Sequence, residues 1–180
     1  MNREKMMQRV TNKRGVLQVL ASVFDPLGKW EPYTIWARLL FQEAVRAVKG
    51  WDDSDTLPED LLDRFGGWQK SGADMERMRI RRWTATRETQ DAEPELHVFS
   101  DASAKAYGVA AYRRMATRDG AVHVSLVFSK ARVVPIKVAN AGHHESIPRL
   151  ELQAARLAAQ TRAFIQRESG EYKCFFHWVD

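Results

Sequence analysis

The chain has 180 residues, which fits one ordinary domain or two small ones and excludes a complete multidomain polymerase. Hydrophobic residues make up 44% and charged residues 28% of the sequence, as in globular rather than disordered proteins. The formal net charge of +5 favours anionic partners and permits nucleic acid without requiring it. The single cysteine, Cys174, excludes an internal disulfide and a zinc finger. With no signal peptide and no apolar run long enough for a membrane span, we expect an intracellular protein, cytoplasmic or nuclear, that does not bind membranes.

The hydrophobic pattern changes near residue 90, and this change predicts two structural units. Before it, apolar residues recur with the spacing of amphipathic helices. Beyond it, short alternating runs are typical of strands. We therefore expect a helical unit over residues 1–90 and an α/β layer over residues 91–180, joined by a polar linker at 86–94.

Three helices are expected in the first unit. Thr11 is the expected N-cap of the first helix, and the turn Asp25-Pro26-Leu27-Gly28 ends it before the second helix begins. Proline and acidic residues near Pro58 mark the start of a third helix. The pair Gly66-Gly67 predicts that this third helix is short or broken.

The second unit is expected to be three strands, a helix and a further strand. The strands are expected over residues 95–101, 106–113 and 121–129 and form an antiparallel meander. A helix starts at Pro148 and leads to the last strand, over 172–179. Because the helical connection returns the chain to the same sheet, the last strand is expected to run parallel to the first. The predicted fold class is thus α+β to α/β.

Three acids of the second unit are expected to converge. Asp101 ends the first strand, Glu151 lies in the first turn of the helix, and Asp180 ends the last strand. Clustered carboxylates repel one another unless cations lie between them, and their hard oxygens suit Mg²⁺ or Mn²⁺ in two-metal phosphoryl chemistry. Each acid also has an ordinary explanation. Asp101 could open a turn, Glu151 could stabilise the first turn of the helix, and Asp180 could be an exposed terminal residue. The positions of these acids alone therefore do not decide whether they bind metal ions.

Several short motifs in a fixed order resemble one known family. Phe99-Ser100-Asp101-Ala102-Ser103, followed by Ala106-Tyr107-Gly108, resembles the first two strands of a ribonuclease H-like domain. The stretches 127–135 (VFSKARVVP) and 147–152 (IPRLEL) resemble the corresponding part of BEL/Pao-type retrotransposon polyproteins. The stretches 13–17 (KRGVL), 23–28 (VFDPLG) and 50–53 (GWDD) are similar to the region after that family's reverse transcriptase palm. The resemblance covers nearly the whole chain.

The resemblance implies a thumb- or connection-like unit of a reverse transcriptase over 1–90 and a C-terminally truncated ribonuclease H-like domain over 91–180. Asp101, Glu151 and Asp180 would then match the first three metal-binding acids, with two Mg²⁺ or Mn²⁺ ions as cofactors. The implied partners are an RNA/DNA hybrid or another nucleic acid duplex and the rest of the polyprotein. The residues expected near the nucleic acid backbone are Ser103, Lys105, Lys130, Arg132 and Arg149.

Three functions stay open at this stage. The chain is a nuclease that cuts RNA in RNA/DNA hybrids, a non-enzymatic nucleic-acid-binding fragment, or an inert retroelement remnant. Because the family's later elements and its fourth acid have no counterpart in the sequence, we expect weak, salt-sensitive duplex binding and little or no cleavage by residues 1–180 alone. Polymerase and protease motifs are also missing. The stretch His143-His144-Glu145 is expected to be an exposed loop rather than a metal site.

Overall fold

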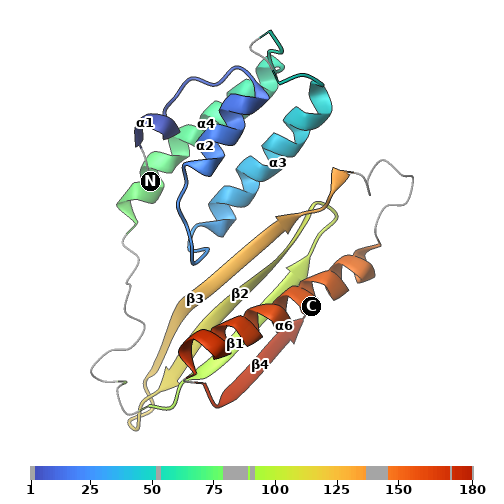
Figure 1. Ribbon diagram of the computed structural model, residues 1–180. Helices are drawn as coiled ribbons and strands as arrows, with labels where there is room; N and C mark the ends of the chain where they lie inside the picture. Colours follow the sequence, from blue (N-terminus) through green and yellow to red (C-terminus); the bar gives the residue numbers. More distant parts are fainter. Residues whose placement is uncertain are drawn as a thin grey trace. The chain divides into compact units, whose positions relative to one another are not determined.

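The computed structural model describes residues 3–51, 54–78, 89, 92–136, 146–170 and 172–179, and these form two compact units (Figure 1). The first unit contains the described residues up to Met78 except Leu27–Lys29. The second contains Leu27–Lys29 and the described residues from Thr89 onward. None of the helices in the described ranges is both long and apolar enough to cross a membrane. The stretch 143–145, which we expect to be an exposed loop rather than a metal site, lies outside these ranges.

The first unit is helical. Its helices are α1 (Arg3–Met6), α2 (Lys13–Ala21), α3 (Glu31–Ala47) and α4 (Glu59–Arg77). Their apolar faces enclose one core, since helices bury such stripes against each other. The largest members of this core are Met6, Leu40, Leu57, Leu61, Phe65 and Trp68.

Two predictions for the helical unit are wrong. The N-cap of α2 is Asn12, not Thr11, because the Asn12 side chain accepts a hydrogen bond from the Gly15 amide at 2.9 Å. Helix α4 runs unbroken through Gly66 and Gly67. Each glycine costs a helix about 1 kcal/mol, but packing of the apolar face of α4 in the core outweighs that cost.

A buried lysine ties α2 to the end of α3. Lys13 is buried, and its ammonium donates hydrogen bonds to the carbonyl oxygens of Val48 at 2.7 Å and Lys49 at 3.0 Å. It also lies 4.7 Å from the centre of the Trp51 ring. Carbonyls at a helix C-terminus carry partial negative charge, so the cation is well placed there. Lys13 in the 13–17 motif therefore has a structural role.

The second unit is a four-stranded sheet with one long helix on a single face. The strands β1 (Glu95–Ala102), β2 (Ala106–Ala116) and β3 (Val122–Val133) form an antiparallel meander, and β4 (Cys174–Val179) pairs parallel to β1. The strand order is β3-β2-β1-β4. Helix α6 (Ile147–Ser169) packs on β1 and β2. The predicted order of elements and the parallel last strand are confirmed.

Alternation along β1 separates the two faces of the sheet. Leu96, Val98 and Ser100 are buried and share one parity. Leu96 and Val98 form a core with Leu157, Ala158 and Ile165 of α6, so this is the face that the helix covers. His97, Phe99 and Asp101 have the opposite parity and lie on the face without a helix. We call this second face the open face. Within the polar linker expected at 86–94, Thr89 is buried.

Candidate metal site

The candidate site lies where β1 and β4 end. The two strands run in the same direction, and α6 begins near the edge at which they end (Figure 1). In their register the last pair is Ser100 with Val179. The carboxyl ends of parallel strands and the start of a helix form a common place for ligands, and the helix start also attracts anions.

The structure locates two of the three predicted acids at this edge. Asp101 is exposed near the end of β1, and its carboxylate accepts a hydrogen bond from the Ala102 amide at 2.6 Å. Glu151 lies half-buried in α6, just after the first turn rather than in it as expected, because the helix already begins at Ile147. Asp180 lies outside the described residues. Within the described ranges, no three His, Cys, Asp or Glu side chains gather as a group that could hold a metal ion. The convergence of all three acids stays a prediction.

The predicted basic contacts gather at the same edge. Register places Lys130 of β3 in one row with Val109 and Ser100, and Arg132 in one row with Tyr107 and Ala102. Both cations are exposed. Lys105 is exposed in the turn between β1 and β2, and Arg149 is exposed in the first turn of α6. Four positively charged side chains therefore lie around the strand ends, where they would attract a polyanion.

Ser103 has a structural role that the sequence interpretation missed. Its hydroxyl donates to the Ala106 carbonyl at 3.0 Å and accepts from the Ala106 amide at 3.2 Å. Its own amide also donates to that carbonyl, at 2.8 Å. Ser103 thus closes the turn between β1 and β2, as serine commonly does in tight turns. A contact to nucleic acid by Ser103 stays a prediction.

Ser100, next to Asp101, has an unpaired hydroxyl. The residue is 5% exposed, and its Oγ finds no hydrogen-bond partner within the part of the chain that the structure describes. Buried hydroxyls nearly always have a partner, so such an atom points to a missing water, ion or ligand group. With the carboxylates, it gives the strand ends a set of oxygen atoms of the kind that hard divalent cations prefer.

A comparison of the sequence with known protein families finds one match. The model of the Pao retrotransposon-like RNaseH-like domain matches residues 12–180. The chain belongs to this family. The resemblance found in the sequence is thereby confirmed, and the match of this Pao-family chain includes both the helical unit and the sheet unit.

One solved structure that matches the chain is that of a foamy viral protease-reverse transcriptase in complex with double-stranded DNA. It is 13% identical to the Pao-family chain, with a TM-score of 0.45. The match covers 91% of this chain and 25% of the viral chain, so the Pao-family chain spans about a quarter of that protein's length. No curated protein matches the chain significantly.

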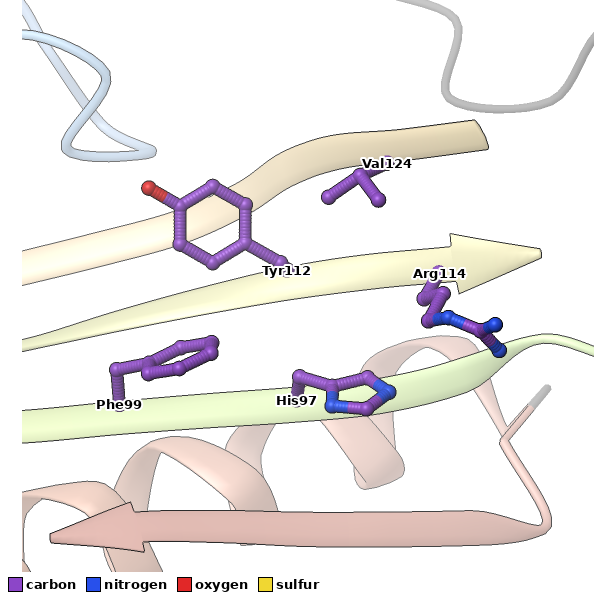
Figure 2. A pocket seen from close by; sticks show the side chains of 5 residues that line it. All are labelled: His97, Phe99, Tyr112, Arg114 and Val124. Atoms are coloured by element: carbon purple, nitrogen blue, oxygen red, sulfur yellow. The ribbon is translucent and has the colours of Figure 1, made fainter. Parts of the chain in front are cut away.

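The open face of the Pao-family sheet carries a row of aromatic rings. The ring of His97 stacks on Phe176 with centroids 4.6 Å apart, and Phe99 stacks on Trp178 at 5.8 Å. Tyr112 meets Phe99 edge to face. A pocket of about 270 Å³ lies on this face. Figure 2 shows the side chains that line it in front of the sheet, with α6 behind. The side chains that line it are His97, Phe99, Tyr112, Arg114 and Val124.

The polar groups on this face bind one another. The indole N–H of Trp178 donates to Nδ1 of His97 at 3.2 Å, so the opposite ring nitrogen, Nε2, carries the hydrogen and donates to Glu95 at 3.0 Å. Arg114 donates to the same carboxylate at 2.7 Å. The hydrogen bond from His97, and to a smaller extent the one from Arg114, lowers the pKa of the Glu95 carboxylate. The open face is therefore apolar with an internally paired polar cluster, a feature that the sequence interpretation did not predict.

Proposed function

We propose that this Pao-family domain is a metal-dependent nuclease that cuts the RNA strand of RNA/DNA hybrids at the ends of β1 and β4. The observation that carries the proposal is the parallel register of these strands, which ends with Ser100 beside Val179. These two residues directly precede Asp101 and Asp180 in the sequence. Family membership supports the same chemistry, since ribonuclease H-like domains generally act with divalent metal ions.

The residues present fit a hard divalent cation. Asp101 lies on the open side of the sheet and Glu151 on the helix side, so an ion held by both would lie beyond the strand ends rather than over either face. We propose Asp180 as the third carboxylate. Oxygen ligands of this kind suit Mg²⁺ or Mn²⁺, and the buried, unpaired hydroxyl of Ser100 adds a further polar group.

Acidic and basic residues of the chain would have different roles in the proposed cleavage. Divalent ions bound here would activate a water molecule and stabilise the charge that develops on the scissile phosphate. Asp101, Glu151 and Asp180 would hold these ions in place. Lys130 and Arg132 would bind backbone phosphates and fix the duplex over the strand ends, with Lys105 and Arg149 beside them.

The test is cleavage of a hybrid whose RNA strand carries a 5′ fluorophore, with Mg²⁺ and with EDTA. In keeping with the little or no cleavage expected from the sequence, we expect at most slow, Mg²⁺-dependent cleavage. Asp101→Asn and Glu151→Gln should each reduce it by more than the about 10–100-fold that is typical of removing a group that only orients a metal ligand. Matched controls are Asp119→Asn in the β2–β3 turn and Glu168→Gln at the far end of α6, both exposed acids. Cleavage that is equal in Asp101→Asn, or unaffected by EDTA, would contradict the proposal.

The four cations around the strand ends support a second candidate, nucleic acid binding without cleavage. In this case the domain would bind duplexes through Lys130, Arg132, Lys105 and Arg149 and leave them intact. Fluorescence anisotropy over a range of salt concentrations separates the two. Removing either Lys130 or Arg132 should lower the slope of log affinity against log salt by about 1. Binding with this salt dependence but no metal-dependent cleavage would favour the second candidate over the nuclease.

A further inference from the structure

The hydroxyl of Ser100 is buried and unpaired at a position that the proposed chemistry does not yet explain. Its Oγ is enclosed, and no described residue accepts or donates a hydrogen bond to it. The backbone of β1 is already paired on both sides, with β2 and with β4, so the ladder leaves little for this hydroxyl to bind. Packing alone does not explain a hydroxyl at this position, because burying an unpaired hydroxyl destabilises a fold.

The position of Ser100 connects it to the helix side of the candidate site. Alternation turns its side chain toward α6, away from the open face that Asp101 occupies. Glu151 belongs to the N-terminal part of α6, which begins near the end of β1 (Figure 1). Ser100 therefore lies one residue before one predicted metal ligand and on the same side of the sheet as another.

We propose that Ser100 is a positioning residue of the metal site. When the ion is bound, its hydroxyl donates a hydrogen bond toward the carboxylate of Glu151, directly or through one water molecule, and so orients that carboxylate for the ion. This inference rests on the proposed function, because it requires a cation at the strand ends. Hydrogen bonds to metal ligands of this kind typically affect metal affinity 10–100-fold.

The experiment measures Mn²⁺ affinity by isothermal titration calorimetry and the melting temperature without metal. Ser100→Ala removes the hydroxyl, whereas Ser100→Thr keeps it. The matched control is Ser125→Ala. The Ser125 hydroxyl is also buried and unpaired among the described residues, but it lies on β3 in one row with Arg113 and Leu96, near the start of β1. Both alanine variants should keep or raise the metal-free melting temperature, since neither loses a hydrogen bond.

The two alanine variants should differ in metal binding. Ser100→Ala should weaken Mn²⁺ binding by about 10–100-fold, whereas Ser125→Ala and Ser100→Thr should stay within about threefold of the parent chain. Parental Mn²⁺ affinity in Ser100→Ala would overturn the inference. So would a lower metal-free melting temperature with unchanged affinity, because that result indicates a purely structural role.

Failure of the inference can be told apart from failure of the proposed function. If the parent chain binds Mn²⁺, Asp101→Asn does not, and Ser100→Ala binds like the parent, only the role of Ser100 is wrong. If the parent chain shows no saturable Mn²⁺ binding, or Asp101→Asn binds equally well, the metal site itself is wrong and the inference falls with it.

Discussion

Ser100 of β1 lies beside Val179 of β4 in the parallel pairing of the two strands. One residue further along the sequence, the two strands lead to Asp101 and to Asp180. The register thus gives a physical reason to expect Asp101 and Asp180 close together, although most of the second unit separates them in the sequence. The proposed nuclease site depends on this register and on the start of α6 at the same edge.

Helix α4 should become more stable when its central glycines are replaced. A Cβ atom added at Gly66 or Gly67 would meet no other group, and neither residue has a positive φ. Gly66→Ala and Gly67→Ala should each raise the free energy of unfolding by about 0.5–1 kcal/mol, because alanine loses less backbone entropy in a helix. Urea denaturation measures the change.

Gly170 is the matched control for this prediction. It ends α6 with φ +62°, a left-handed conformation that suits glycine. Gly170→Ala should therefore lower the free energy of unfolding. Stabilisation by this substitution, together with destabilisation at Gly66, would contradict the structural assignment of both positions.

The Glu95 cluster should make stability depend on pH in the acid range. Hydrogen bonds from His97 and Arg114 hold the pKa of Glu95 below its unfolded value of about 4.3. The resulting stabilisation is present above the unfolded pKa and is lost as the pH falls through the folded pKa. Glu95→Gln should therefore be less stable than the parent by up to about 1 kcal/mol at pH 7, and the difference should shrink below pH 4.

Urea denaturation at several pH values measures this effect. Glu93→Gln is the control, because the pair that Glu93 forms with Lys173 is exposed. A stability difference for Glu95→Gln that stays constant from pH 7 to pH 3 would show that the carboxylate does not act through its charge.

The aromatic rings of the open face should bind hydrophobic dyes. Phe99 and Trp178 are 43% and 50% exposed, although they stack on each other. Exposed apolar patches of this kind bind anilinonaphthalene sulfonate. Phe99→Ser and Trp178→Ser should each reduce dye fluorescence and lower the free energy of unfolding by about 1 kcal/mol, through loss of the ring contact. Trp36→Ser on α3 is the control, and an equal loss of fluorescence there would contradict a role for the open face.

Much of the sheet unit could be predicted from the sequence, because its signals are local. Alternating apolar residues marked the strands, and Pro148 marked the start of α6 to within one residue. The parallel course of β4 followed from the connection through a helix. Local patterns failed where tertiary packing decides, as at Gly66 and Gly67, and where neighbouring polar residues compete for one cap, as Asn12 and Thr11 do.

Residues of the candidate site were predicted to different extents. Asp101, Glu151 and the basic residues could be chosen from strand ends, a helix start and the family motifs. The unpaired hydroxyl of Ser100 and the bonds that link Glu95, His97 and Trp178 could not, because they depend on strand register. Alternation in the sequence was a usable signal for the open face, since Phe176 and Trp178 share one parity with Cys174.

The most direct test of the metal site is paramagnetic broadening of backbone amide resonances by Mn²⁺ on the ¹⁵N-labelled chain. We predict that substoichiometric Mn²⁺ broadens the amides of Asp101, Ala102 and residues 149–152 first, and that Asp101→Asn removes this pattern. Broadening that spreads evenly over exposed acids such as Asp119 and Glu168, or that is unchanged in Asp101→Asn, would contradict a metal site at the ends of β1 and β4.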